Sequence, residues 1–506
     1  MDRPTGMDRN AGSDEPSSPE TSAAFKPSPL SDREINVIIF GVLISMLLAA
    51  LDQTIVAPAM PTMGKALGHA DYLPWVVTAY LLAATAMAPL YGKISDIYGR
   101  RPVILSAILI FLAGSVISAL APNMLVLVAG RAVQGLGGGG LFALAQTVIG
   151  DLVSPRDRAR YAAWISGTWA VASIAGPLLG GAFAEHLHWS LIFWINVPLG
   201  LAAIAIINKP LKALPAAGRH HSIDAPGAIL LIIATCLLLL ALSWGGSNHD
   251  WLSPEIIGLV TGSAICWALF ALRQFRATEP LISLDVLANT VVRAGTLSMF
   301  AVQASSIGLA VYLPVYLQSV QDLSAAASGL AMLGLLLGTV AGASFSGRVI
   351  PRVTHYKSIA VLGLCFAIAC QAILAVASSS GLVLVMSLTA GVGLGTGTTF
   401  PVITVSVQNA VDRAHLGVAT GVLTFLRTLG GALGVGMLGA VALGYGLPLV
   451  GESVEPGRTS APAEAFGVLF LVCAATMAVA LLFLILMPER ALRGRAPEGS
   501  GRTDPP

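Results

Sequence analysis

Residues 36–58 read NVIIFGVLISMLLAALDQTIVAP, an apolar run whose only charged side chain is that of Asp52. The hydrocarbon core of a bilayer is about 30 Å thick, and a helix needs about 20 mostly apolar residues to cross it. The run is far longer than a β-strand and shows no alternation of polar and apolar residues. It predicts a membrane-spanning helix that carries an acid within it.

Thirteen further runs of this kind follow along the chain. They cover residues 73–91, 102–121, 124–149, 161–184, 191–208, 226–244, 254–272, 294–319, 326–346, 358–377, 381–408, 416–443 and 465–487. Composition agrees with them, since 55% of the residues are hydrophobic and 11% are charged, against about 25% charged in soluble proteins. We expect an all-α membrane protein with fourteen transmembrane helices. The absence of strand-like alternation excludes a membrane β-barrel.

The basic residues predict which side of the membrane faces the cytoplasm, because cytoplasmic loops are enriched in lysine and arginine. Of the 28 lysines and arginines, all but four fall in the two tails or in alternate connections between spans. The exceptions are Lys65 and Arg458 on the opposite side, and Arg131 and Arg427 inside spans. We therefore expect a multi-pass protein of the inner or plasma membrane with both termini in the cytoplasm.

A similar pattern, glycine followed by basic residues, recurs after the second and tenth spans. It begins at Gly92-Lys93 and at Gly347-Arg348, although the second copy lacks an acid. If the two connections are equivalent, the chain holds two six-helix pseudo-repeat halves, as transporters do, with the substrate path between them. Generic loop composition is the alternative source of this pattern. The predicted segments are a disordered cytoplasmic tail (1–34), a first half (35–208), two inserted helices with a linker (209–276), a second half (277–488) and a second disordered tail (489–506).

Seven short motifs are spread over nearly the whole chain. They are Leu51–Pro61 in the first span, Gly92–Arg101 after the second, Arg131–Gly135 in the fourth, Gly176–Gly181 in the fifth, Trp189–Pro198 at the start of the sixth, Tyr312–Gln318 in the ninth and Phe425–Gly431 in the thirteenth. In these motifs the chain resembles the fourteen-helix drug–proton antiporter branch of the major facilitator superfamily. The resemblance implies a secondary active transporter that exports small amphipathic compounds, such as drugs and toxic metabolites, by proton antiport with alternating access. The sequence departs from the family pattern at Ser190, where arginine is usual.

Polar and charged side chains inside the spans are the candidates for proton coupling and the substrate path. A charge within a span costs about 2.5–3.5 kcal/mol on insertion scales, and such charges mark ion pathways and proton relays. We expect Asp52 to act in proton coupling or in binding cationic substrates. The resemblance implies that Arg131, one turn from Gln134, assists proton exchange, and the path includes Arg427 and Asn196. The alternatives are an Asp52 that the external vestibule solvates and an Arg131 that only anchors hydrogen bonds. The sequence leaves open whether Asp52 pairs with Arg131 or with Arg427.

The connection after the second span is predicted to form a conformational latch between the halves. The predicted latch residues are Gly92, Asp96, Gly99, Arg100, Arg101 and Asp151. The two glycines permit a tight turn, and Asp96 can accept N–H groups at a helix N-terminus. The resemblance implies that Asp96 contacts the start of the thirteenth span near Leu416-Gly417, and Arg100 can pair with Asp151. A solvated turn that follows the positive-inside rule is the alternative.

The fifth span carries Gly176, Pro177, Gly180 and Gly181, which let helices approach closely and bend the backbone. In the resembled family this motif is associated with antiporters rather than symporters, and ordinary small-residue packing is the alternative. The glycine run 137–140 lies within a span, follows no strand and lacks a Gly-Lys-Ser/Thr sequence, so it is not a nucleotide-binding loop.

Other functional classes receive no support from the sequence. The five cysteines lie in apolar runs and are interpreted as small core residues; they are Cys236, Cys266, Cys365, Cys370 and Cys473. We expect no enzyme activity, no cofactor and no metal, because no residue cluster has metal-ligand spacing. The expected partners are a small-molecule substrate, protons and the lipid bilayer, with no nucleic acid and a monomeric protein. The single embedded acid favours neutral or monocationic substrates. Two alternatives are an exporter or importer of one metabolite (a siderophore, sugar or amino acid) and a channel or receptor on the same fold.

Overall fold

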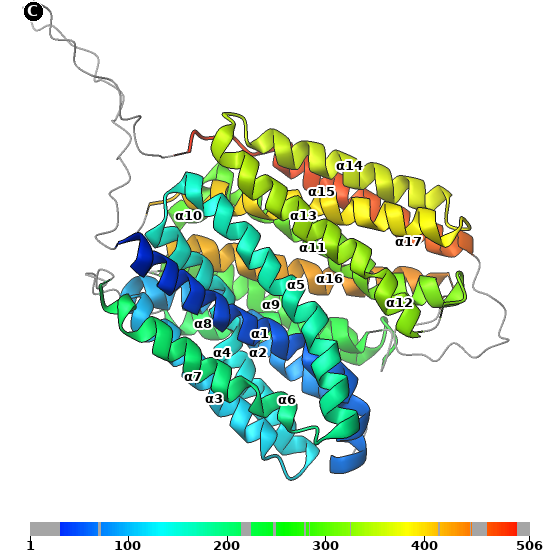
Figure 1. Cartoon of the computed structure of the whole chain (residues 1–506), viewed down its shortest axis with the longest axis horizontal. Coiled ribbons are helices and arrows are strands. Elements are labelled where there is room, and N and C mark those ends of the chain that lie inside the picture. Colours follow the sequence, from blue (N-terminus) through cyan, green and yellow to red (C-terminus); the bar gives the residue numbers. More distant parts are fainter. Residues whose placement is uncertain are drawn as a thin grey trace, which may run out of the picture.

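The structure is a computed structural model that describes residues 31–68, 72–213, 224–245, 249–277, 280–282, 284–323, 325–412, 415–445, 447 and 463–492. These residues form helices and no strand, with one isolated bridge between Gly245 and His249. Most of both predicted tails lies outside the described residues. The helices, shown in Figure 1, are α1 (Asp32–Leu67), α2 (Leu73–Tyr98), α3 (Arg100–Ala119), α4 (Met124–Leu152), α5 (Pro155–His186), α6 (Leu191–Trp194), α7 (Asn196–Asn208), α8 (Ala225–Trp244), α9 (Pro254–Arg276), α10 (Leu284–Ala288), α11 (Thr290–Ser319), α12 (Ala325–Ala331), α13 (Leu333–Val349), α14 (Lys357–Val376), α15 (Leu382–Asn409), α16 (Leu416–Gly444) and α17 (Ala463–Leu486).

Fourteen segments within the described residues are long and apolar enough to cross a membrane, which confirms the predicted fold class. Two spans that the sequence predicted as single helices are broken. The sixth consists of α6 and α7, which meet at Ile195, and the tenth consists of α12 and α13, which meet at Met332. The first break has a local cause, because Pro198 cannot donate to the carbonyl of Trp194 and its ring clashes with that group. Average hydropathy does not register such a break.

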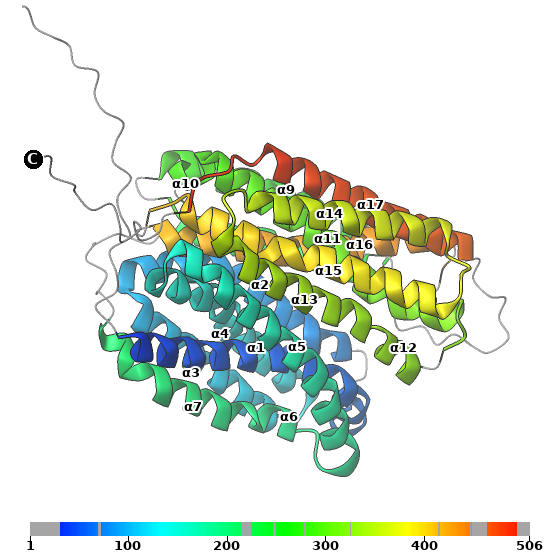
Figure 2. The same ribbon diagram turned by 45° about the horizontal axis from the view of Figure 1, so that its top comes forward.

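The second half repeats the helix pairs of the first. In the first half, α1 packs against α5 and α7, α4 against α2 and α3, and α3 against α7. Eight spans later, α11 packs against α16 and α17, α15 against α13 and α14, and α14 against α17. Figure 2 shows α1–α7 on one side and α13–α17 on the other. The repeated pairing supports two six-helix halves, and their exact boundaries stay predictions.

The two halves meet along α2 with α16 and along α5 with α13. Exchanging the halves converts one of these pairs into the other, so the interface follows the same pseudo-symmetry as the bundles. Helix α16 also contacts α4, and α15 contacts α5. The predicted cytoplasmic end of the bundle, where α1 begins and α17 ends, lies at the left of Figure 1.

Helices α8 and α9 are the two inserted spans, and they pack against each other. Arg273 at the end of α9 pairs with Asp224 at the start of α8, with 3.1 Å between Nε and Oδ1. Ser263 of α9 donates to the carbonyl of Ala234 on α8 at 2.8 Å. Helix α8 also contacts α2 and α16, and Trp267 of α9 packs against Phe425 of α16, so the pair lies beside the interface between the halves.

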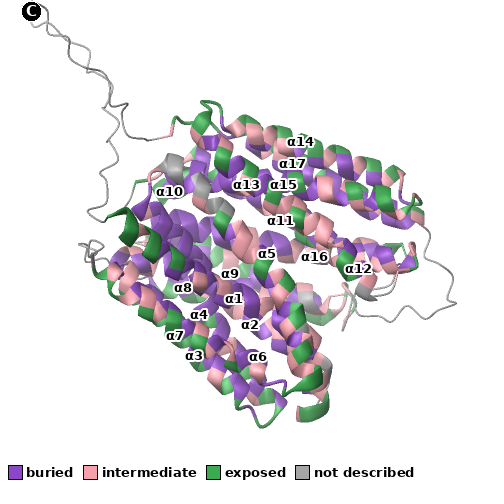
Figure 3. Cartoon of the chain, viewed as in Figure 1, coloured by how far each residue is buried: buried purple, intermediate pink, exposed green. Residues whose placement is uncertain are grey.

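Exposed residues, green in Figure 3, lie on the outer surface of the bundle, and many of them are apolar. Helix α9 is the least buried of the described spans, and its Leu269, Leu272 and Phe275 are exposed. Such a surface is unfavourable in water and fits a lipid environment. Among the cysteines, Cys370 and Cys473 are buried, but Cys365 is exposed and the other two are half-buried. The interpretation of the cysteines as core residues therefore holds for only two of the five. An apolar run in the sequence does not show which face of the helix points to lipid.

Candidate functional site

Five polar side chains come together inside the first half and form what we name the Asp52 cluster. Its members are Asp52 (α1), Ser115 (α3), Arg131 and Gln134 (α4) and Asn196 (α7). All five are buried, and Asp52, Ser115, Gln134 and Asn196 have no exposed surface. Four of them were predicted site residues. Ser115 was not, and no motif in the sequence marks it.

The carboxylate of Asp52 accepts hydrogen bonds from three side chains. Arg131 donates through Nη1 to Oδ2 at 2.5 Å, and Gln134 and Asn196 donate through their amide groups to Oδ1 at 2.7 and 3.1 Å. The same two amides reach the hydroxyl of Ser115 at 2.7 and 3.1 Å. The cluster therefore connects four helices through one carboxylate, and a change of its charge would be felt by all of them.

The guanidinium of Arg131 is held on every side. Its Nε donates to the carbonyl of Val76 on α2 at 2.9 Å, and its Nη1 also donates to Gln134 at 2.6 Å. The ring centroids of Tyr80 and Phe193 lie 4.5 and 5.7 Å from its Cζ. An arginine keeps its charge in proteins, so it needs such partners when buried. The partner that the sequence left open for Asp52 is thus Arg131.

Arg427 lies apart from the Asp52 cluster, on α16 of the second half. Its Cζ lies 5.5 Å from the ring centroid of Phe400 on α15. It forms no ion pair or hydrogen bond with another residue of the described chain, and it is partly exposed. It is therefore an unpaired cation within a membrane span.

Asp96 joins the end of α2 to the start of α16. Its Oδ1 accepts from the backbone N–H of Gly417 at 3.1 Å, and its Oδ2 accepts from that of Val418 at 2.9 Å. These N–H groups belong to the first turn of α16, which has no carbonyl partners for them and carries a positive partial charge. Gly92 lies directly against Gly417, and a Cβ at Gly92 would overlap the carbonyl oxygen there. The sequence-predicted contact between the halves is present.

Arg100 orders the same connection. Its Nε donates to Asp151 at 2.7 Å, and its Nη1 donates to Asp96 at 2.5 Å and to Ser95 at 2.6 Å. Gly99 separates α2 from α3 with a φ of 87°, a conformation that favours glycine. Arg101 does not join this group. It donates to the carbonyl and side chain of Asn208 at 3.1 and 2.7 Å and ties α3 to the end of α7 within the first half.

A second contact between the halves lies beside the latch, and sequence reasoning missed it. Gln408 of α15 approaches the carbonyl of Gln146 on α4 and the hydroxyl of Thr420 on α16, both at 3.3 Å. Gly150 of α4 lies against Gln408 and Leu416. We name Gln146, Gln408 and Thr420 the polar seal. Uncharged side chains in apolar helices gave no signal that would single them out.

The glycine motif of α5 divides between two faces. Gly176 and Gly180 lie so close to Thr54 and Ile55 of α1 that a side chain would overlap them. Pro177 is exposed, and a Cβ at Gly181 would meet open space. Thr54 donates to the carbonyl of Ala172 on α5 at 2.8 Å. The two packed glycines therefore hold α5 against the helix that carries Asp52.

The second half contains a neutral counterpart of the Asp52 cluster. Ser305 of α11 accepts from the amide of Gln371 on α14 at 3.1 Å and donates to the carbonyl of Cys473 on α17 at 2.9 Å. Helices α11, α14 and α17 occupy the places that α1, α3 and α7 hold in the first half. No charged side chain takes part, so the embedded acid belongs to one half alone.

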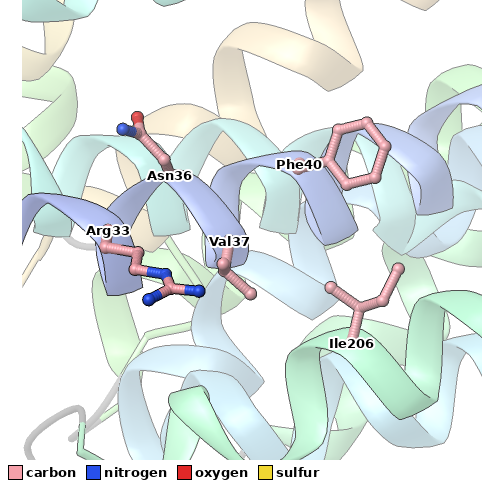
Figure 4. A pocket seen from close by; sticks show the side chains of 5 residues that line it. All are labelled: Arg33, Asn36, Val37, Phe40 and Ile206. Atoms are coloured by element: carbon pink, nitrogen blue, oxygen red, sulfur yellow. The ribbon is translucent and has the colours of Figure 1, made fainter.

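The described residues contain no group of three or more His, Cys, Asp or Glu side chains that could hold a metal ion. An open groove of about 670 Å³ lies on the outer surface near the start of α1. As Figure 4 shows, it is lined by Arg33, Asn36, Val37 and Phe40 of α1 and by Ile206 of α7. None of these residues belongs to the Asp52 cluster, the latch or the seal.

Comparisons with known proteins agree with this architecture. The family profile described as Major Facilitator Superfamily matches residues 42–435. An uncharacterized MFS-type transporter of Mycobacterium tuberculosis is 32% identical over 456 residues, which are 90% of this chain but 66% of that protein, just under two thirds. Multidrug transporter protein MdtP of Bacillus subtilis is 32% identical over 429 residues, 85% of this chain and 79% of that protein.

Among solved structures, the proton:xylose symporter XylE superimposes with a TM-score of 0.64 at 14% identity, covering 92% of this chain and 98% of that one. At this identity the likeness concerns the fold alone. The family profile and the relatives carry the assignment, because they cover most of the chain at the level of sequence. The chain belongs to the major facilitator superfamily and is a multi-pass membrane protein.

Proposed function

We propose that this protein is a transporter rather than an enzyme, and that it exports small amphipathic compounds in exchange for protons. The observation that carries the proposal is the buried Asp52–Arg131 pair, a titratable acid held with its cation inside a membrane span. Embedded acids of this kind mark ion and proton pathways. The multidrug name of the Bacillus relative supports the substrate class.

Coupling would act through the charge of Asp52. A proton that binds the carboxylate removes the negative partner of Arg131 and turns one acceptor oxygen into a donor. The hydrogen bonds that Arg131, Gln134 and Asn196 make to Asp52 must then rearrange. Because these residues lie on α1, α4 and α7, the rearrangement would shift the balance between two packings of the first half.

The latch would set which side of the transporter is open. Asp96 and the polar seal join the halves at the predicted cytoplasmic end, so an opening toward the cytoplasm requires both contacts to break. This arrangement favours an outward-facing or cytoplasmically closed state for the conformation described. The buried position of Asp52 in the same conformation favours proton coupling over direct contact with a cationic substrate.

The remaining expectations follow from the same proposal. We place the protein in the inner or plasma membrane with both termini in the cytoplasm, because the basic residues gather in alternate connections. We expect it to work as a monomer, since each half provides its own buried core. A proton that moves down an inside-negative membrane potential into the cell supplies about 2.3 kcal/mol per 100 mV.

The test uses a host strain without its own drug pumps. Cells that carry the wild type, Asp52→Asn or Ser45→Ala are compared for dye and drug accumulation with and without a protonophore. Ser45 is the matched control, because it is buried on α1 and bonds only to the carbonyl of Val42 on its own helix. We expect wild type and Ser45→Ala to lower accumulation until the protonophore is added, and Asp52→Asn to fail at equal membrane levels. Export that persists in the protonophore, or in Asp52→Asn, contradicts the proposal.

A further inference from the structure

Arg427 is a cation that has no anionic partner among the residues that the structure describes. In the part of the chain that the structure describes, the only other arginine within the interior of a span, Arg131, is neutralised by Asp52. A guanidinium cannot lose its proton in a protein, and an unpaired charge inside a membrane span is unfavourable. The π face of the Phe400 ring, whose centroid lies 5.5 Å from the Cζ of Arg427, is a weak partner for the charge. A charge kept at such a cost needs a counter-ion at some stage of the transport cycle.

The position of Arg427 is fixed by the polar seal. Thr420 lies seven residues before Arg427 on α16, so both side chains point to the same face, about 10 Å apart along the helix. Thr420 contacts Gln408, and Gln408 contacts Gln146 of the first half. Arg427 therefore lies on the face that meets the seal, two turns further from the predicted cytoplasmic end.

Phe400 supports the same placement from α15. It precedes Gln408 by eight residues, about 12 Å along the antiparallel helix. Its ring packs against buried residues of both the first and the second half, so it lies where the two halves meet. The guanidinium above it is partly exposed. Arg427 and Phe400 thus present a cation and an aromatic face together at the interface between the halves, directly beyond the seal.

We propose that Arg427 binds a single negatively charged group, a carboxylate or sulfonate, on an amphipathic aromatic substrate, with Phe400 packing against its apolar body. This rests on the proposed export function and specifies its substrate class. A guanidinium offers a planar pair of donors that match the two oxygens of such a group. Asp52 does not compete for it, because its charge is already paired inside the first half. This substrate class differs from the neutral or monocationic substrates that the sequence favoured. That expectation considered only the embedded acids, whereas the structure shows which embedded charge is left unpaired among the described residues.

The test measures binding to purified full-length protein in detergent with three probes that share one apolar body: 2-naphthoate, 2-naphthylmethanol and 2-naphthylmethylammonium. A ligand that binds the folded state raises the unfolding midpoint in proportion to ln(1 + [L]/Kd). Wild type, Arg427→Gln, Arg427→Lys and the control Ser45→Ala are compared. We expect only naphthoate to stabilise the wild type, with at least a tenfold weaker Kd in Arg427→Gln and an intermediate value in Arg427→Lys. Ser45→Ala, whose hydroxyl bonds to the carbonyl of Val42 on its own helix, should bind naphthoate as the wild type does.

Several outcomes overturn the inference. These are no stabilisation of the wild type by naphthoate, an equal effect in Arg427→Gln, or tighter binding of the ammonium probe than of naphthoate. If Arg427→Gln does not fold, Arg427→Lys and Phe400→Leu decide. We expect each of these two variants to weaken the binding of naphthoate at least threefold. Failure of the proposed function gives a different result. Naphthoate then binds through Arg427, but neither a protonophore nor the Asp52→Asn substitution lowers the rate of its export.

Discussion

The Asp52–Arg131 pair shows how a charged residue is accommodated within a membrane span. Neither partner is solvated, and each is satisfied by the other and by groups on neighbouring helices. A buried pair contributes little net stability compared with apolar residues, but removal of one partner leaves an uncompensated charge. The pair therefore restricts which single changes the fold tolerates.

We predict that Asp52→Leu and Arg131→Met each lower the thermal unfolding midpoint strongly, and that the double variant is more stable than either. Breaking a buried pair costs about 3–5 kcal/mol, whereas replacing both partners by apolar residues is often neutral. The measurement is thermal unfolding in detergent, with Ser45→Ala as a control on the same helix. Losses that simply add in the double variant would show that the two residues do not depend on each other.

Much of this cluster could be predicted from single residues, but not its full membership. Asp52 and Arg131 stand out because a charge in an apolar run has few structural explanations. Ser115 could not be singled out, because a serine in a span commonly bonds to its own helix, as Ser45 and Ser106 do with the carbonyls three residues earlier. The packing of α3 against α4 and α7 brings Ser115 to the amides of Gln134 and Asn196.

At the scale of helices, the contact between α2 and α16 depends on the absence of side chains. Gly92 and Gly417 lie backbone to backbone, which brings Asp96 within reach of the first turn of α16. The sequence predicted this contact through a family resemblance, since no local pattern reports which helix the turn will meet. Hydropathy gave no warning of the breaks at Ile195 and Met332, because it stays high on both sides, although Pro198 marks the first of them.

We predict that Gly92→Ala opens the predicted cytoplasmic end and reduces the export rate several-fold. The added methyl group overlaps the carbonyl of Gly417, so α2 and α16 must separate. In a cysteine-free background, Ala419→Cys reports the change through maleimide labelling from the cytoplasmic side, because Ala419 is fully buried in the described conformation. Gly258→Ala on α9 is the matched control, since a Cβ there meets no neighbour. Equal labelling of both variants would refute the role of this contact.

The inserted helices offer a second test at this scale. We predict that Asp224→Ala loosens α8 from α9 at a cost of about 1–2 kcal/mol, because it removes both an N-cap and an ion partner. Asp224 accepts from the N–H of Gly227 and pairs with Arg273. The unfolding midpoint should fall while Arg273→Gln, which leaves the cap, has a smaller effect. A larger effect of Arg273→Gln would show that the ion pair, not the cap, dominates.

Across the whole molecule, the two halves share their helix pairing but not their chemistry. The first half places an acid, a guanidinium and two amides where the second places Ser305, Gln371 and the carbonyl of Cys473. Pseudo-symmetry of packing therefore does not require symmetry of charge. Proton coupling, as proposed, would be a property of one half, while the unpaired cation Arg427 lies on the other.

This asymmetry predicts that Gln371→Leu changes neither the pH dependence of export nor, by more than about 1 kcal/mol, the stability of the protein. The amide oxygen of Gln371 is buried and has no hydrogen-bond partner among the described residues, so the substitution removes an unsatisfied group together with one hydrogen bond. Asp52→Asn, in the corresponding cluster of the first half, should abolish the pH dependence. Export measured across a series of imposed pH gradients compares the two variants with the wild type. If Gln371→Leu flattens that dependence as Asp52→Asn does, the second half takes part in coupling, and the charge of Asp52 is not its sole origin.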